Sequence, residues 1–528
     1  MGGGVRRRTL VIGASAIGLA GAGSIIALAP LATDPDGEKD CGSVLPPLST
    51  EVARAVAPQI AQPHWVQKGG TVNDASCLSR TGIAGVVAPR SEREVADTLA
   101  YARAAGLTIS PAGVRHSMGG QAFRRGGIMV DMRGLNRVEL HPETSTMTVG
   151  AGATWHDIQK AIHPRFAVKA MQSTDIFTVG GSISVNAHGM DHRAGALMES
   201  IRSIRLMLAD GRIVTASQEE NRELFRLVVG GYGLFGIILS AQLDVVPNDI
   251  YRSERAFLAT RDLPKRLGSI IADPSVGLLY VHLSTAPGSL LNEALIYSYR
   301  RDNGAGALRE PLRDVGATRL RRLTVNLAKR SPALRSFKWW AEKNLEHRIE
   351  VCTASRAQAM HDGEACLVSR NDPMHDSVPY LRNALRNDTD ILQEYFIPRD
   401  RILPFIRGLR TIVREEDANL LNSSVRVVGR EENFLSYAPE PAYSVVLYFN
   451  ERTDAGANAK MARLTSDLID LTHKVGGRFF LPYQLHYSPE QLELSYPEIR
   501  SFFAEKRKWD PEGRFSNSWY ARYAPTLG

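Results

Sequence analysis

Three glycine-rich segments of this 528-residue chain have the residue types that cradle an anion. The first reads PAGVRHSMGGQAF over 111–123, the second TVGGSISVNAHG over 178–189, and the third VGGYGLFGII over 229–238. Small residues in such a loop let backbone N–H groups turn toward a phosphate, and Arg115 adds a positive charge to the first. One glycine-rich turn is a weak indication by itself, so the prediction depends on the order and spacing of all three.

The first glycine segment follows a small β-α-β pattern. Residues 85–89 predict a strand, and Ser91 with Glu94 forms a capping-box pattern before a helix that ends near Gly106. Residues 107–110 predict a second strand. The first glycine segment is therefore expected in the loop that leaves this strand.

Short strands surround the other two segments. They are predicted over 128–131, 138–140, 147–149, 201–208, 212–215 and 236–246. Asp210-Gly211 is a strong two-residue hairpin pattern, and Pro247 ends the last strand. Residues 81–247 are therefore predicted as a mixed α+β domain and not as an alternating, doubly wound one.

After Pro247 the chain changes to strands separated by longer helical stretches. Strands are predicted over 294–299, 425–428 and 443–449, and a helix over 460–474. We interpret this part as a second α+β domain that caps a substrate site.

The composition is that of a globular protein with a basic surface. Hydrophobic residues make up 44% and charged residues 23%, which argues against a disordered or polytopic membrane protein. The net charge is +8, and residues 318–340 hold seven Lys or Arg with no Asp or Glu and end near Phe337, Trp339 and Trp340. This block fits either a solvated basic helix or a surface at a membrane interface. It has no recognisable nucleic-acid-binding module beside it, so no nucleic-acid partner is expected.

The four cysteines give little structural information. They are too few for a disulfide scaffold and have no CxxC spacing, so structural zinc is not expected. One bridge such as Cys352–Cys366 remains open in an oxidising compartment.

The N-terminal residues have the features of a targeting segment. Three arginines at 6–8 precede an uncharged apolar stretch over 10–32, which is long enough to span a bilayer. Arg7-Arg8-Thr9-Leu10 resembles the twin-arginine pattern. We expect an apolar helix that serves as an export signal or a membrane anchor, with the folded part on the extracytoplasmic side. A Rossmann turn over 11–22 is the competing interpretation, but Ser15 replaces its second glycine.

The order and spacing of the glycine segments resemble the FAD-binding domain of the vanillyl-alcohol oxidase and p-cresol methylhydroxylase (PCMH) family. In that family the first loop wraps the pyrophosphate, the second segment lines the flavin and the third approaches the adenine side. The resemblance implies these FAD-binding residues: Pro111, Ala112, Gly113, Val114, Arg115, His116, Ser117, Gln121, Val179, Gly180, Gly181, Ser184, Asn186, His188, Gly189, Gly236, Ile237 and Ile238.

The triplet Arg115-His116-Ser117 is the most informative part of the first loop. Members that resemble alditol oxidases, aldonolactone oxidases and cytokinin dehydrogenases carry a histidine here that is bonded to the flavin 8α-methyl group. A neutral imidazole is a suitable nucleophile. The resemblance thus implies FAD linked covalently through His116, and no cysteine near the second segment offers a second linkage.

The C-terminal half is similar to the sugar-alcohol and aldonolactone oxidase branch. Residues 390–398 resemble a strand that places side chains over the flavin. Residues 422–428 resemble a Ser-Glu-x-Arg segment, in which Arg426 is kept and Ser424 replaces the glutamate. Residues 481–487 stand where a His-Trp-Gly-Lys motif is usual, without its lysine. These departures leave the substrate open.

The chemistry that the resemblance implies is hydride transfer from a substrate carbon to flavin N5 while a base takes the hydroxyl proton. Arg426 is predicted as the fixed cation, and His486 as the proton acceptor. Tyr395 is a third predicted catalytic residue. It alternates with Gln393 along one strand face, and the two either shape the pocket or are core and polar-face residues.

No metal site is expected from the sequence. His188 and His192 stand at i, i+4 with Asp191 between them, a spacing that suits a metal ion. Gly189 and the implied flavin-lining position of this segment argue against one.

These patterns together predict a two-domain α+β fold of the PCMH type. The expected divisions are a leader over 1–32, a linker over 33–78, the FAD-binding domain over 79–247, the substrate or cap domain over 248–490, and a segment over 491–528 that returns to the FAD domain. The expected function is an FAD-dependent oxidoreductase that oxidises a CH–OH group of a sugar-derived, lactone or polyol small molecule, with oxygen as acceptor. The alternatives are a dehydrogenase that passes electrons to a membrane quinone and an inactive binding or cell-envelope protein.

Overall fold

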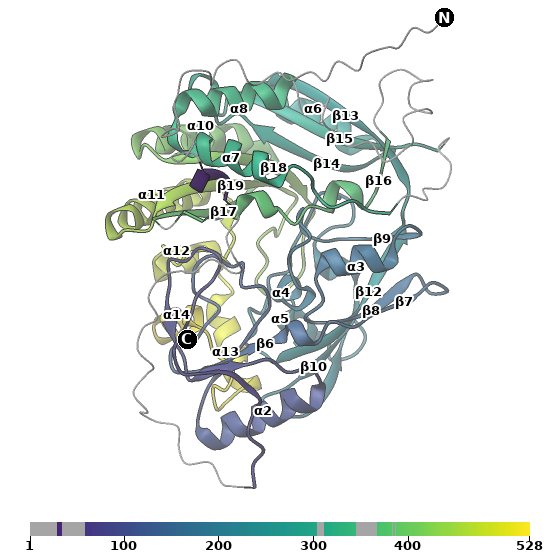
Figure 1. Ribbon diagram of the computed structural model, residues 1–528, viewed down its shortest axis with the longest axis vertical. Helices are drawn as coiled ribbons and strands as arrows, with labels where there is room; N and C mark the ends of the chain where they lie inside the picture. Colours follow the sequence, from purple (N-terminus) through teal and green to yellow (C-terminus); the bar gives the residue numbers. More distant parts are fainter. Residues whose placement is uncertain (1–28, 34–58, 304–310, 345–366, 383, 386) are drawn as a thin grey trace, which may run out of the picture.

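The computed structural model describes residues 29–33, 59–303, 311–344, 367–382, 384–385 and 387–528. Its elements form two lobes, with the N-terminal lobe in the lower half of Figure 1 and a cap lobe in the upper half. The N-terminal lobe is built on a four-stranded and a six-stranded sheet, and the cap lobe on an eight-stranded sheet. The predicted mixed α+β architecture is confirmed.

The four-stranded sheet carries the first glycine segment. Its strand order is β1 (Trp65–Lys68), β4 (Gly85–Val87), β6 (Ile128–Asp131) and β5 (Ile109–Ala112), and β4 and β5 both run parallel to β6. Helix α2 (Glu92–Ala105) connects β4 to β5. The Ser91 side chain caps its start, and Gly106, with φ of 67°, ends it in the left-handed conformation that glycine adopts freely. A separate small hairpin pairs β2 (Thr71–Val72) with β3 (Thr81–Gly82).

The six-stranded sheet supports the other two glycine segments. Its order is β11 (Ile213–Ala216), β10 (Ile201–Met207), β12 (Ile237–Pro247), β8 (Thr146–Gly150) and β7 (Val138–His141), with β9 (Phe166–Val168) also paired to β12. Helices α3 (Trp155–Ile162), α4 (Val179–Ser184) and α5 (Arg222–Val228) belong to this lobe. The β10–β11 hairpin turns at Asp210-Gly211, as predicted.

The cap lobe is built on an antiparallel sheet with helices packed against it. The order is β16 (Leu367–Ser369), β13 (Ile250–Ala259), β15 (Glu293–Arg301), β14 (Val276–Leu283), β18 (Asn419–Val428), β19 (Ala442–Arg452), β17 (Asp388–Pro398) and β20 (Arg478–Phe479). The helices of this lobe include α6 (Leu263–Ala272), α10 (Ile402–Glu415) and α11 (Ala455–Lys474). Part of the sheet lies against the N-terminal lobe (Figure 1).

The basic block forms two helices, α7 (Thr318–Arg330) and α8 (Pro332–Asn344). The break falls at Ser331, which is extended before Pro332, because proline disfavours a helical conformation in the residue before it. On α8, Trp339 is buried and donates its indole N–H to Glu293. Phe337 and Trp340 are about half exposed and stack on each other.

The C-terminal helices return to the N-terminal lobe. They are α12 (Pro489–Ser495), α13 (Ile499–Trp509) and α14 (Ser518–Leu527), drawn in yellow in Figure 1. Between α13 and α14, Phe515 forms a parallel bridge with Ile109 of β5, whose N–H donates to the Arg514 carbonyl at 2.8 Å. This segment therefore lies beside the strand that leads into the first glycine loop.

Residues 29–32 form a helical turn that contacts α7, where the Asn326 side chain donates to the Leu31 carbonyl at 2.8 Å. The expected apolar helix and twin-arginine pattern, and Cys41, Cys352 and Cys366, lie outside the described residues. Cys77 is in a disulfide. Within the part of the chain that is described, no helix has the length and apolar character needed to cross a bilayer.

Candidate active site

The three glycine segments meet in the N-terminal lobe. A Cβ added at Gly113 of the first would lie 1.9 Å from the Thr178 hydroxyl, at the start of the second. The N–H of Tyr232 in the third donates to the Ser184 carbonyl of the second at 2.9 Å. Segments that are far apart in the sequence therefore form one backbone-lined region.

The first loop has a backbone conformation that few side chains favour. Arg115 and Met118 have φ of 58° and Gly120 has φ of 65°, all in the left-handed region. The buried Asp74 carboxylate accepts the Gly120 N–H at 2.6 Å and so supports the loop from behind. Alternating left-handed residues turn successive N–H groups to one side, which suits an anionic group.

Three of the other predicted cofactor residues differ in their exposure. Gly181 is exposed, so its backbone is open to a ligand. Ile237 and Ile238 are buried in β12, where they pair with Met207 and Leu206. These two isoleucine side chains belong to the core of the six-stranded sheet, and contact with a cofactor would have to use their backbone.

His116 is neutral at physiological pH. Burial and the nearby positive charge of Arg382 lower the pKa of its imidazole to about 4. Its ring contacts Phe177 edge to face, with centroids 5.7 Å apart. An uncharged imidazole in this loop has the nucleophilic form that a covalent attachment requires.

A second cluster lies where the cap sheet meets the N-terminal lobe, centred on Glu394 of β17. Its carboxylate lies 2.6 Å from His188 Nε2 and accepts from the Ser444 hydroxyl at 2.5 Å. The Tyr483 hydroxyl is 3.5 Å away. Arg426 of β18 is in register with Ser444 of β19, so the side chains of Arg426 and Ser444 lie on the same face of the sheet. The cluster joins His188, from the second glycine segment, to the cap.

Glu394 is ionised despite its burial. Burial alone would raise the pKa of its carboxyl, but interactions with His188 and Arg426 outweigh this effect and lower the pKa. Burial also lowers the pKa of Arg426, which Glu394, Tyr483 and Tyr280 oppose. Because arginine stays protonated in proteins, the cluster contains a fixed, partly buried cation beside a carboxylate.

His188 is oriented so that one ring nitrogen is available. Its Nε2 faces the ionised Glu394 carboxylate, so this nitrogen carries the hydrogen. Its Nδ1 is buried and has no hydrogen-bond partner among the described residues. The rings of Phe396 and Tyr437 pack against the imidazole at 5.4 and 5.9 Å. The arrangement fixes the direction of His188 Nδ1 inside the site.

Two of the predicted catalytic residues lie elsewhere. Tyr395 is on the opposite face of β17, where its hydroxyl donates to Gln393 and its ring packs on Phe405 of α10. Glu394, the preceding residue on β17, points to the other face of the strand, toward the N-terminal lobe. We therefore take Glu394, and not Tyr395, as the candidate catalytic residue of this strand. His486 has no described contact with the Glu394 cluster, and burial with the charge of Arg522 lowers its pKa to about 4.

Sequence reasoning singled out Arg426 and His188, which the structure brings into one cluster, but it did not single out Glu394, Ser444 and Tyr483. The alternation of residues along β17 separates Glu394 from Tyr395 in the sequence. Which of the two faces meets the N-terminal lobe depends on the packing of the sheet.

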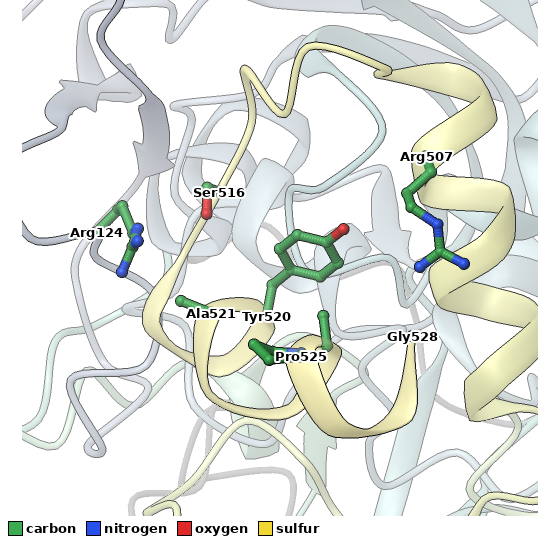
Figure 2. Close-up of a pocket in the computed structure, with 8 residues that line it drawn as sticks. Arg124, Arg507, Ser516, Tyr520, Ala521, Pro525 and Gly528 are labelled. Carbon is green, nitrogen blue, oxygen red and sulfur yellow. The ribbon is translucent and has the colours of Figure 1, made fainter.

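A hollow of about 640 Å³ lies apart from both clusters. Figure 2 shows it around Tyr520 of α14, between Arg124 and Arg507. None of the predicted site residues lines it. The chemistry of the Glu394 cluster, and not the size of this surface hollow, identifies the candidate site.

Comparison with known proteins finds a different family model for each of two parts of the chain. Residues 83–217 match the model of an FAD binding domain, and residues 374–523 match the model of D-arabinono-1,4-lactone oxidase. The first match contains His116 and His188, and the second contains Glu394 and Arg426.

The similar proteins include several oxidoreductases. The chain is 33% identical to an uncharacterized oxidoreductase of the fasciation locus (ORF5) of Rhodococcoides fascians over 161 residues, 30% of this chain and 36% of that protein. It is 33% identical to decaprenylphosphoryl-beta-D-ribose oxidase of Mycolicibacterium smegmatis (33% of this chain, 37% of that protein) and to cytokinin dehydrogenase 2 of Arabidopsis thaliana (30% and 32%). The chain thus matches only about a third of the length of these relatives.

Proposed function

We propose that this FAD-linked oxidoreductase, whose chain joins a PCMH-type FAD-binding domain to a domain of the D-arabinono-1,4-lactone oxidase type, oxidises a CH–OH group of a sugar-derived, lactone or polyol substrate. The observation that carries the proposal is the His188–Glu394–Arg426 cluster between the two lobes. It combines a proton acceptor, a group that orients it and a fixed cation in one buried site.

The residues of the N-terminal lobe fit FAD. The left-handed turns of the first loop, and the lack of room for a side chain at Gly113 beside Thr178, bring the backbones of the first two glycine segments close together. The first loop would hold the pyrophosphate, and the neutral His116 would form the covalent link. FAD, when bound, supplies the acceptor for a hydride from the substrate carbon.

Residues of the chain accept the substrate's hydroxyl proton and stabilise the charge that develops on the substrate. His188 Nδ1 takes the hydroxyl proton, and Glu394 holds the ring in the required tautomer and stabilises the imidazolium that results. Positioned bases of this kind contribute about 10²- to 10⁴-fold in rate. Arg426 stabilises the negative charge that develops on the substrate oxygen.

The covalent link is tested by acid precipitation of the purified full chain. A yellow pellet and a fluorescent band on a denaturing gel are expected, and His116→Ala should release the flavin into the supernatant. His473→Ala changes an exposed histidine at the end of α11 and should keep the flavin in the pellet. Free flavin from the unmodified chain would refute the link while leaving the flavoenzyme intact.

The reaction is tested by anaerobic mixing with a panel of aldonolactones, alditols and aldoses. A substrate should bleach the flavin absorbance, and His188→Gln should slow this bleaching by at least about 100-fold with the flavin still bound. Colourless protein after refolding with FAD would refute the enzyme proposal and favour an inactive binding protein.

A membrane quinone is the second candidate for the electron acceptor. The exposed Phe337–Trp340 pair and the basic residues of α7 and α8 have the composition of an interfacial surface, and residues 29–32 contact α7. We propose membrane association, with export or anchoring, on this basis. Reoxidation of the reduced enzyme by oxygen and by a soluble quinone analogue, measured side by side, distinguishes an oxidase from a dehydrogenase.

A further inference from the structure

Four side chains from four separate segments meet where the N-terminal lobe contacts the cap lobe. His156 lies in α3 and Asp175 lies between β9 and α4, whereas Asp314 precedes α7 and His375 follows β16. The two imidazole rings stack with their centroids 4.7 Å apart. None of these residues belongs to the Glu394 cluster.

The buried Asp175 fixes both imidazoles in the same tautomer. Its Oδ2 lies 2.9 Å from Nδ1 of His156 and 2.9 Å from Nδ1 of His375, and its Oδ1 accepts from the Ser377 hydroxyl at 2.5 Å. A carboxylate accepts hydrogen bonds, and Nδ1 of His375 also lies 3.0 Å from the side-chain oxygen of Gln159, so both Nδ1 atoms carry the hydrogen.

The other two ring nitrogens converge on a second carboxylate. Nε2 of His375 lies 3.3 Å, and Nε2 of His156 3.6 Å, from Oδ1 of Asp314. In neutral imidazoles with a hydrogen on Nδ1, each Nε2 presents a lone pair. Two lone pairs and an anionic oxygen therefore face one another, and this arrangement favours a bound cation.

The two stacked rings, with centroids 4.7 Å apart, bring their Nε2 atoms to the same carboxylate oxygen, which suits one shared ion. One divalent ion would serve both nitrogens and the carboxylate at once. Histidine nitrogen and aspartate oxygen are ligands of Zn²⁺, at about 2.0–2.2 Å.

We propose that Nε2 of His156, Nε2 of His375 and the carboxylate of Asp314 bind a divalent transition-metal ion of the zinc type. Asp175 acts behind the ligands, as carboxylates that accept the second N–H of a metal-binding histidine do. Asp314 is 66% exposed, so the ion enters from solvent and its fourth position is open to water. His375 and Asp175 are 2% and 0% exposed, which fixes the inner part of the site.

In the described structure the ammonium group of Lys160 lies against Asp314, where the proposed ion would bind. Its Nζ lies 3.0 Å from Oδ1 and 3.3 Å from Oδ2 of Asp314. The Lys160 side chain is 43% exposed, so it can move into solvent when an ion arrives. Loss of this ammonium group should therefore strengthen metal binding, because a competing positive charge is removed.

The proposed ion links the two lobes. His156 belongs to the N-terminal lobe, and Asp314 and His375 belong to the cap side of the chain. Because such an ion binds the folded state and not the unfolded one, it should raise the midpoint of thermal unfolding.

The test uses the full-length protein with its native flavin, dialysed against EDTA and then titrated with Zn²⁺ in a calorimeter, with metal content measured by mass spectrometry. One equivalent of Zn²⁺ is expected to bind. His375→Gln and Asp314→Asn should each weaken binding by at least about tenfold. Lys160→Met should tighten it, and His473→Gln, an exposed histidine far along α11, should leave it unchanged. Asp314→Asn changes an exposed side chain, so its effect can be read without loss of the fold.

Three results would overturn the proposal. They are the absence of stoichiometric binding by the unmodified protein, unchanged binding in both His375→Gln and Asp314→Asn, and weaker binding in Lys160→Met. Flavin absorbance, recorded for each variant, separates a lost metal site from a lost fold.

Discussion

Replacing Glu394 by glutamine tests the charge arrangement on which the proposed active site depends. The substitution keeps the size of the side chain but removes the carboxylate that faces His188 at 2.6 Å and opposes the buried charge of Arg426. Removing one partner of a buried charge pair typically costs about 3–5 kcal/mol, because the other charge stays buried without compensation. With an unfolding entropy of about 2.1 cal/mol/K per residue, this loss corresponds to a fall of roughly 3–5 °C in the unfolding midpoint.

The assay is thermal unfolding of four proteins: the unmodified chain, Glu394→Gln, Arg426→Met and the double variant. If the two charges interact, the double variant should be less destabilised than the sum of the single ones, by about 0.5–3 kcal/mol. Glu493→Gln, which disrupts an exposed pair with Arg500, serves as the control and should change the midpoint little.

The pH dependence gives an independent check. The pKa of Glu394 is lowered in the folded protein, so its ionised form stabilises the fold above the pKa of the unfolded chain. That contribution is lost as the pH falls through the folded pKa. The difference in unfolding free energy between the unmodified protein and Glu394→Gln should therefore become smaller at acidic pH. The reasoning is refuted if the destabilisations of the two single variants simply add in the double variant, or if this difference does not change with pH.

Two further predictions concern other buried positions. Burial raises the pKa of Glu451 from 4.5 to about 7, so the free energy of unfolding should fall as the pH rises from 4.5 to 7, by at most about 3 kcal/mol. In denaturant titrations, Glu451→Gln should flatten this pH dependence. The same pH dependence in the variant and the unmodified protein would contradict the prediction. Gly113→Ala should lower the FAD content of the purified protein, because the new Cβ would lie 1.9 Å from the Thr178 hydroxyl. Gly268→Ala, on α6 with open space around it, should leave flavin content unchanged, and equal content in both variants would show that the first loop tolerates a side chain.

Local patterns in the sequence predicted much of the N-terminal lobe. The strand over 128–131 and the helix end at Gly106 were both predicted, because a short apolar run and a left-handed glycine cap depend only on neighbouring residues. The basic block at 318–340 was interpreted as a solvated helix or a membrane-interface surface, and Pro332 within it indicates the observed break after Arg330.

The functional sites were less predictable because they depend on how distant segments pack. Alternation along 390–398 divides the strand into two faces, and only the assembled sheet shows that Glu394, and not Tyr395, meets His188. The His156–His375 cluster has no spacing motif at all, since its two histidines are 219 positions apart and belong to different lobes. Sequence spacing reveals a ligand set only when its members lie on one element or in adjacent ones.

The return of the C-terminal segment to β5 sets an order of assembly. The Ser110 hydroxyl donates to the Ser516 carbonyl, a bond between positions 406 residues apart, and the first glycine loop leaves the same strand. During synthesis the whole cap lobe is made before this partner emerges, so β5 and the first glycine loop gain their C-terminal neighbour only after the cap lobe is complete. The export route proposed above moves proteins across the membrane after they have folded, which suits this order.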